Sequence, residues 1–172
     1  MADPLGLVIM GVSGSGKTTV GALLAQRLGW QYAEADAFHS EANVAKMAAG
    51  HPLNDEDRWP WLTAIAAWID ERIARREAGV VTCSALKRKY RDMLRRPDVR
   101  FIYLQGSPEL IAKRLAARHD HFFKADMLAS QFADLEPPAP DEAVITVPID
   151  GSPAEIVDAI GLALGLVIGP GR

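Results

Sequence analysis

The feature that most constrains the fold of this chain is the segment MGVSGSGKTT, residues 10–19, which combines three glycines with a lysine and two threonines. An apolar run, residues 5–10, precedes it, and a helical pattern that begins near Gly16 follows it. Glycines allow consecutive backbone N–H groups to turn inward around phosphate oxygens. The first turn of the helix directs its positive dipole end at the same anion. The segment therefore predicts a phosphate-binding loop between a strand and a helix.

This loop supplies the residues that we expect to hold ATP and Mg²⁺. Lys17 can reach the β and γ phosphates, and the Thr18 hydroxyl can bind the metal ion. The nucleotide-binding residues expected from the loop are Gly11, Ser13, Gly14, Ser15, Gly16, Lys17, Thr18 and Thr19. A GTPase would also need a guanine-reading Asn-Lys-x-Asp motif, which the sequence lacks. An ATP-driven motor would need an acid where Cys83-Ser84 ends an apolar strand, so a small-molecule kinase is favoured.

Apolar runs alternate with helical patterns along the rest of the chain. Strands are predicted over residues 5–10, 30–36, 79–85, 99–105 and 143–149. Helices are predicted over residues 16–28, 40–47, from 60, after 85, over 107–118, from 126 and after 152. This alternation predicts an α/β fold, with a five-stranded parallel sheet covered by helices on both faces. The length of 172 residues and the lack of a long linker predict a single domain, residues 1–172.

Composition limits the partners and the compartment. The net charge is −3, so a general polyanion-binding surface is not expected. The single cysteine, Cys83, cannot form an internal disulfide and fits a reducing compartment. The first residues lack the charged and apolar regions of a signal peptide, and no apolar run reaches the roughly 18 residues of a membrane span. These observations predict a cytoplasmic protein without a membrane partner.

A polar segment, residues 36–61, is the candidate acceptor site. Asp36 and His39 follow the second predicted strand, at the edge where an open parallel sheet places its ligands. A carboxylate there can orient an attacking hydroxyl or accept its proton. Glu34 lies two residues before Asp36, hence on the same face of a strand, and can hold a Mg²⁺-bound water. Lys46 and Arg58 can bind an acidic acceptor. The ordinary alternatives are a turn carboxylate for Asp36, a surface or core histidine for His39, and solvated cations for the other two.

A basic segment, VVTCSALKRKYRDMLRR over residues 80–96, contains six cations and one acid. Such a segment can bind nucleic acid, form a solvated helix or bind a small anion. On a helix Lys87 and Arg91 share one face with Arg88 beside them, so these three are the candidate anion ligands. The other three cations are expected to be solvated, namely Lys89, Arg95 and Arg96.

Six stretches together resemble the small P-loop gluconate kinases: GVSGSGKTT, DAFHSEANVAKMAAGHPLNDEDRWPWL, CSALKRKYRDMLR, FIYLQG, RLAARHDHFF and SQFADLE. The resemblance extends from Gly11 to Glu136. It implies a P-loop NTPase fold like that of nucleoside monophosphate and shikimate kinases, with an acceptor-binding segment at about 36–61 and a mobile lid at about 118–126. It also implies a homodimer and the ATP- and Mg²⁺-dependent phosphorylation of D-gluconate at its 6-hydroxyl, feeding the pentose phosphate or Entner–Doudoroff route.

The resemblance implies roles for individual residues. Arg118 is expected to act in catalysis with Lys17 and Asp36, and Arg114 and Pro153 to flank the nucleotide with Arg118. The expected acceptor-binding residues are Asp36, His39, Lys46, Arg58, Lys87, Arg88, Arg91 and His121, and the expected metal-binding residues are Thr18 and Glu34. Three positions depart from the family pattern, because Glu34, Ser40 and Asp120 stand where aspartate, proline and glycine are common.

Two other functions remain open at this point. The chain can phosphorylate another small hydroxy acid such as shikimate or a related sugar acid, or it can be an ATP-dependent regulator without chemistry. Asp36 and the lid arginines argue against a regulator. Nucleic-acid binding would need aromatic stacking partners beyond Tyr90 and a positive overall field, so no nucleic-acid partner is expected.

Overall fold

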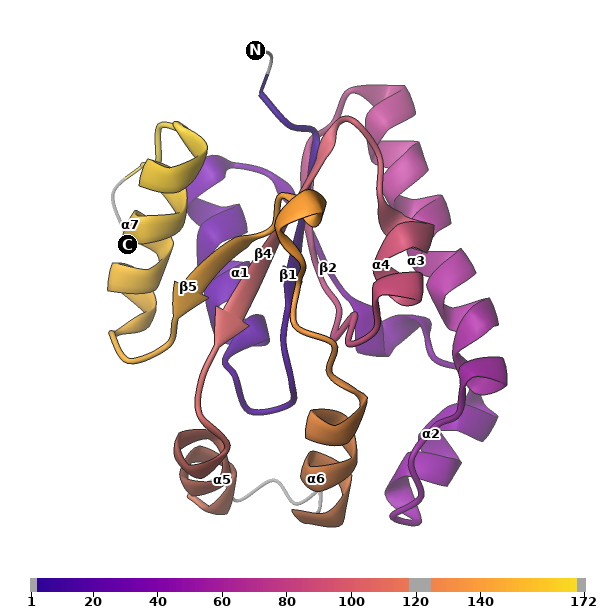
Figure 1. Cartoon of the computed structure of the whole chain (residues 1–172). Coiled ribbons are helices and arrows are strands. Elements are labelled where there is room, and N and C mark those ends of the chain that lie inside the picture. Colours follow the sequence, from indigo (N-terminus) through magenta and orange to yellow (C-terminus); the bar gives the residue numbers. More distant parts are fainter. Residues whose placement is uncertain (1–2, 118–124, 170–172) are drawn as a thin grey trace.

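The structure is a computed structural model, which describes residues 3–117 and 125–169 (Figure 1). Its centre is a five-stranded sheet with the strand order β2-β3-β1-β4-β5, and every neighbouring pair is parallel. The strands are β1 (Gly6–Met10), β2 (Gln31–Glu34), β3 (Gly79–Thr82), β4 (Val99–Gln105) and β5 (Ile145–Pro148). The predicted α/β fold with a five-stranded parallel sheet is therefore confirmed.

Helices cover both faces of the sheet (Figure 1). On one face, α1 (Lys17–Leu28) and α7 (Pro153–Leu164) pack over a core that includes Leu7, Ile9 and Ile102. On the other face, α3 (Asp55–Arg75) and α4 (Arg88–Leu94) pack over a second core that includes Val8 and Met10. The alternation of β1 side chains between the two cores follows from the period of two in a strand. It explains why the whole strand is apolar.

Four of the remaining elements lie at the carboxyl edge of the sheet. A 3₁₀ turn, η1 (Ala35–Phe38), and α2 (Glu41–Ala48) follow β2. The helices α5 (Pro108–Ala116) and α6 (Ala125–Asp134) lie beyond the ends of β1 and β4 (Figure 1). A second 3₁₀ turn, η2 (Pro140–Glu142), leads into β5. Because parallel strands end at the same edge, α5 and α6 lie beside the phosphate loop, with contacts from Leu115 and Gln131.

The start of α3 differs from the sequence prediction. The helix was expected to begin at Pro60, but it begins at Asp55, and Pro60 lies inside it. Asn54 is the N-cap, and its side chain and that of Asp57 satisfy each other's backbone N–H groups at 2.8 and 2.9 Å. This capping box outweighs the one intrahelical hydrogen bond that proline cannot donate. The predicted cap of α7, by contrast, is confirmed, with a capping box between Ser152 and Glu155.

None of the helices within residues 3–117 and 125–169 combines the length and the apolar character that a membrane span requires.

Candidate active site

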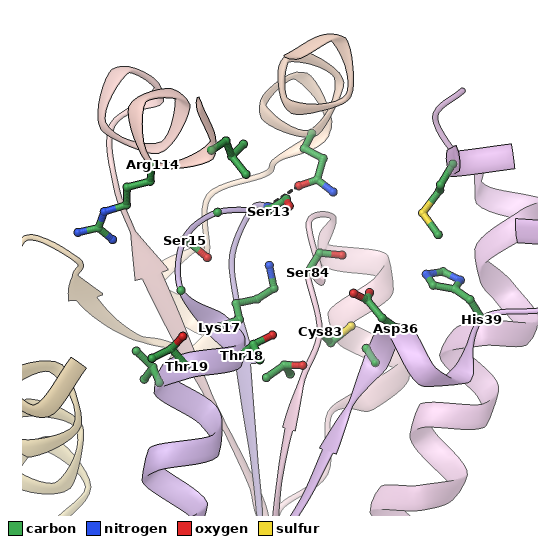
Figure 2. A pocket seen from close by; sticks show the side chains of 18 of the residues that line it. Ser13, Ser15, Lys17, Thr18, Thr19, Asp36, His39, Cys83, Ser84 and Arg114 are labelled. Carbon is green, nitrogen blue, oxygen red and sulfur yellow. Dashed lines mark hydrogen bonds between the residues drawn. The ribbon is translucent and has the colours of Figure 1, made fainter. Parts of the chain in front are cut away.

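One cavity of about 710 Å³ lies at the carboxyl edge of the sheet (Figure 2). Residues of three regions line it. The phosphate loop contributes residues 13–19. The acceptor side contributes Asp36, His39, Met47, Pro52, Leu53, Arg58 and Trp61, and β3 and the residues after it contribute Thr82, Cys83 and Ser84. The third region contributes Arg114, Leu115, Ser130, Gln131, Gly151 and Pro153. The cavity therefore joins the predicted nucleotide site to the predicted acceptor site.

The phosphate loop has the backbone that its glycines require. Gly11, Gly14 and Gly16 have φ angles of 149°, 84° and 95°, which side-chain-bearing residues rarely adopt. A Cβ on Gly14 would also lie 2.8 Å from Leu115 of α5, so the loop and α5 approach closely only because this residue is glycine. The ammonium of Lys17 donates to the carbonyl oxygens of Gly11 and Val12, both at 2.9 Å. These contacts hold the Lys17 side chain against the first residues of the loop.

A glutamine that the sequence analysis did not identify contacts the phosphate loop. The backbone N–H of Ser13 donates to Oε1 of Gln131, on α6, at 2.6 Å. Gln131 lies in the stretch SQFADLE, which takes part in the family resemblance, but that stretch does not indicate which residue it contacts; the packing of α6 against the loop shows this. Its side chain occupies one of the loop amides that a phosphate oxygen would use.

The nucleotide side of the cavity contains two of the predicted residues. Nη2 of Arg114 donates to the carbonyl oxygen of Ile149 at 2.7 Å, and this anchors the guanidinium beside the loop that precedes α7. Pro153 lines the cavity at the start of α7. Figure 2 places Arg114 on the opposite side of Lys17 from Asp36 and His39. Arg118, His121 and most of the predicted lid, residues 118–126, lie outside the described residues.

The acceptor side is built where β2 runs into η1. The carbonyl oxygen of Ala35 accepts a hydrogen bond from Nε1 of Trp61 at 2.7 Å, which ties this turn to α3 and places Asp36 in the cavity. The indole ring of Trp61 also stacks on the imidazole of His39, with ring centroids 4.3 Å apart and planes 9° from parallel. Burial lowers the pKa of His39; the Asp36 carboxylate raises it, and Arg58 lowers it further.

Arg58 is the buried cation of this half of the cavity. Only 9 % of the residue is exposed, yet it lines the cavity. Its Nη1 donates to the hydroxyl of Tyr90, on α4, at 2.9 Å and to Oδ2 of Asp134, at the end of α6, at 3.4 Å. The guanidinium thus links α3 to two other helices, α4 and α6, and an anion in the cavity could compete with Asp134 for it.

The two residues predicted for the metal side lie close together. The hydroxyl of Tyr32 donates to Oε1 of Glu34 at 3.0 Å, and its oxygen lies 3.3 Å from the carbonyl oxygen of Thr18. Burial and then the Glu34 carboxylate raise the pKa of Tyr32, so this hydroxyl stays a donor. Thr18 lines the cavity, whereas Glu34 is not among the described lining residues. The Thr18 hydroxyl at the loop and the Glu34 carboxylate, which contacts Tyr32, fit a hydrated Mg²⁺, because this ion keeps several of its waters when bound.

Four of the predicted acceptor ligands, including Arg91, are not among the described residues that line the cavity. Lys46 pairs with Asp57 at 2.7 Å and thereby links α2 to the first turn of α3. Lys87 pairs with Asp55 at 3.2 Å. Arg88 forms a bidentate pair with Asp141 at 3.0 and 2.6 Å. Each cation already has a carboxylate partner from a distant segment, and none of the three is among the described lining residues.

Arg91 was expected to bind the acceptor, but the structure places it in the protein core. Its side chain is completely buried, and it forms a bidentate ion pair with Glu142 at 2.7 and 3.0 Å. Its Nη1 also donates to the carbonyl oxygens of Ala85 and Leu86 at 2.9 and 3.2 Å. The Arg91 guanidinium lowers the pKa of Glu142 to about 2, so the carboxylate stays charged. Arg91 therefore holds η2 against α4 and does not face the cavity.

The other three cations of the basic segment are paired as well. Lys89 pairs with Asp55, Arg95 with Glu142 and Asp92, and Arg96 with Asp70. Lys89 is exposed, as expected, whereas Arg95 and Arg96 are only partly exposed, because carboxylates from η2 and α3 lie beside them. The positive charge of this segment is thus used for packing within the protein.

The cavity and the fold together define a small P-loop kinase. The sequence matches the shikimate kinase family over residues 13–161. It is 46 % identical to a gluconokinase of Gluconobacter oxydans (strain 621H), over 91 % of this chain and 89 % of that protein. It is 43 % identical to the thermoresistant gluconokinase of Escherichia coli (strain K12), over 89 % of this chain and 91 % of that protein. The chain belongs to the gluconokinase family and is an enzyme of that class.

Solved structures agree with this assignment. The fold superimposes on a gluconokinase from Sinorhizobium meliloti 1021 with a TM-score of 0.85 and 43 % identity, over 96 % of this chain and 94 % of that one. A shikimate kinase from Bacteroides thetaiotaomicron superimposes with a TM-score of 0.68 at 17 % identity, over 94 % of this chain and 99 % of that one. The second similarity concerns the fold alone.

Proposed function

We propose that this enzyme transfers the γ-phosphoryl group of ATP to the 6-hydroxyl of D-gluconate, giving 6-phospho-D-gluconate and ADP. The observation that carries the proposal is that the phosphate loop and Asp36, His39 and Arg58 line the same cavity. Gluconate combines one carboxylate with a chain of hydroxyls. The cavity offers a buried cation for the carboxylate and a carboxylate for the reacting hydroxyl. The 43–46 % identity to gluconokinases supports the same choice.

In the proposed mechanism, Asp36 orients the acceptor hydroxyl and accepts its proton as the oxygen attacks the γ-phosphorus. Lys17 stabilises negative charge on the phosphate oxygens, because its ammonium lies in the same cavity, at the loop. Arg58 binds the acceptor carboxylate. The apolar walls formed by Met47, Leu53 and Trp61 exclude water from the acceptor, which protects the phosphoryl group from hydrolysis.

Further residues complete the proposed site. Arg114 and Pro153 flank the nucleotide, and Thr18, with Glu34 acting through a water, would hold Mg²⁺, which supplies charge neutralisation at the phosphates when bound. For Arg118 and His121 we propose, from the family resemblance, contacts with the phosphates and with the acceptor. Lys46 supports the site indirectly through Asp57. We further propose a cytoplasmic homodimer whose product enters the pentose phosphate or Entner–Doudoroff route.

A coupled assay of ADP release across a panel of acids tests the proposed function. D-Gluconate should give ATP- and Mg²⁺-dependent turnover well above that of shikimate and of related sugar acids. Turnover with shikimate and none with gluconate would exclude the proposed substrate. Binding of ATP with no stimulation by any acceptor would instead indicate a regulator without chemistry.

Replacing Gln131 by alanine should tighten ATP binding. The Gln131 side chain accepts a hydrogen bond from the Ser13 N–H, which we expect a phosphate oxygen of ATP to use instead. A hydrogen bond of this kind contributes about 0.5–1.5 kcal/mol, so its loss predicts a dissociation constant about 2- to 13-fold lower. Isothermal titration calorimetry with a non-hydrolysable ATP analogue measures this. Weaker binding in the variant would show that Gln131 contacts the bound nucleotide instead.

A further inference from the structure

Asn43 is a buried polar residue whose role the proposed mechanism does not explain. It lies on α2, only 7 % of it is exposed, and it is not among the described residues that line the cavity. Its Nδ2 atom lies 2.8 Å from the backbone carbonyl oxygen of Asp57 and 3.3 Å from Nδ1 of His39. One amide nitrogen therefore contacts both α3 and the imidazole ring.

These two contacts determine which imidazole nitrogen carries the proton. A backbone carbonyl can only accept a hydrogen bond, so the side-chain atom that faces Asp57 must be the amide NH₂ group. The same NH₂ group faces Nδ1 of His39, and it has a second hydrogen to donate there. Nδ1 must then be an acceptor without a proton, which leaves the proton of the neutral ring on Nε2.

The surroundings hold the amide and the ring in this relation. The Ser40 hydroxyl accepts from the backbone N–H of Asn43 at 3.2 Å and caps α2. The pair of Lys46 and Asp57 ties the other end of α2 to α3. The stacked indole of Trp61 prevents the imidazole ring from turning over freely. The three residues of the motif His39-x-x-x-Asn43-x-x-Lys46 therefore all contact the first turns of α3.

The charged groups near the ring favour its neutral form. Asp36 from η1 favours the imidazolium, whereas Arg58 from α3 and the burial of the ring oppose it. Lys46 and Asp57, from α2 and α3, pair with each other. Of the two ring nitrogens, only Nδ1 has a hydrogen-bond partner among the described residues. Figure 2 shows the imidazole ring beside Asp36, at the wall of the cavity.

We propose that Asn43 is a positioning residue that holds His39 as the Nε2–H tautomer, so that His39 donates a hydrogen bond to an oxygen of the acceptor. The donation rests on the proposed function; the tautomer does not. His39 is then a donor that binds a carboxylate or hydroxyl oxygen, and Asp36 is the residue that accepts the proton of the reacting hydroxyl. An acceptor without an oxygen next to Nε2 of His39 would lose this hydrogen bond.

Nitrogen-15 NMR of the imidazole rings in the ligand-free enzyme tests the tautomer directly. The chain has four histidines, and the spectrum of a His39→Gln variant identifies the His39 signals. In the parent enzyme at neutral pH we expect a protonated Nε2 and an unprotonated Nδ1. In Asn43→Asp the new carboxylate accepts from Nδ1, so the ring should shift to the Nδ1–H tautomer or to the imidazolium. Its pKa should then rise by about one unit or more.

Kinetics test the donation to the acceptor. Both Asn43→Asp and Asn43→Ala should raise the KM for gluconate about 2- to 13-fold, which corresponds to one hydrogen bond, with a smaller effect on the KM for ATP. Ser40→Ala is the matched control, because it weakens the cap of α2 but leaves the Asn43 amide in place. This control should keep the Nε2–H tautomer.

The possible outcomes separate the two claims. An Nδ1–H tautomer in the parent enzyme, or an unchanged spectrum in Asn43→Asp, would overturn the positioning role. A Ser40→Ala spectrum that changes as in Asn43→Asp would attribute the effect to α2 packing and would also overturn the positioning role. If gluconate fails as a substrate in the acid panel, the donation to gluconate fails with it, whereas the ligand-free spectrum still decides the tautomer.

Discussion

Replacing Asp36 by asparagine should lower the turnover number with gluconate by about 10²- to 10⁴-fold, the usual contribution of a positioned general base. Asparagine has nearly the same shape and can still accept one hydrogen bond, but its amide cannot take the proton of the attacking hydroxyl. The Ala35 carbonyl contact with Trp61 should keep the turn in place. ATP affinity, measured by calorimetry, should be nearly unchanged because the phosphate loop is not altered.

Replacing a carboxylate by an amide outside the cavity, at Asp141, is the control for the loss of one negative charge. Asp141 is exposed, pairs with Arg88 and is not among the described residues of the cavity. The Asp141→Asn variant should therefore retain the parent kcat and KM. If Asp36→Asn turns over at the parent rate, Asp36 has no part in proton transfer. If it loses ATP affinity as well, its role is structural.

Replacing Glu142 by glutamine should reduce the free energy of unfolding by about 3–5 kcal/mol, the usual cost of leaving a buried charge without its partner. Arg91 and Glu142 are both buried, and glutamine cannot neutralise the guanidinium. Urea unfolding, followed by circular dichroism, measures the change. Below the new unfolding temperature the variant should keep the parent KM for gluconate, because Arg91 lies outside the cavity.

A double variant tests whether the Arg91–Glu142 ion pair serves stability alone or also acceptor binding. Arg91→Met combined with Glu142→Leu removes both charges and should recover most of the stability lost by Glu142→Gln. A raised KM for gluconate in this stable double variant would return Arg91 to the acceptor site. A cost of less than about 1 kcal/mol for Glu142→Gln would mean that water reaches the pair, as in exposed ion pairs.

The same ion pair predicts a dependence of stability on pH. The folded protein lowers the pKa of Glu142 from an ordinary value of 4.5 to about 2. The stabilisation is therefore complete above about pH 4.5 and is lost as the pH falls from 4.5 toward 2. Acid unfolding of Glu142→Gln should show a weaker pH dependence in that window than acid unfolding of the parent.

The sequence by itself determined the sheet and the phosphate loop. Strands buried on both faces are mostly apolar, and β1 and residues 101–104 of β4 are recognisable for that reason. The loop is equally recognisable, because its glycines and Lys17 serve a backbone geometry that depends on neighbours in the chain. Local capping motifs such as Ser152 with Glu155 were readable as well. The start of α3 was missed because the proline at position 60 outweighed the capping box at Asn54.

The basic helix shows what only the tertiary structure decided. Its residues 87–96 contain one acid, so Lys87, Arg88 and Arg91 were expected to bind an external anion and the other three cations to be solvated. The partners are instead Asp55 and Asp70 on α3 and Asp141 and Glu142 near η2, all distant in the sequence. Ion pairs, like the contacts of Gln131 with the phosphate loop and of Asn43 with His39, depend on distances between segments that no local pattern encodes. Secondary structure follows from neighbours along the chain, whereas the use of a charge follows from its neighbours in space.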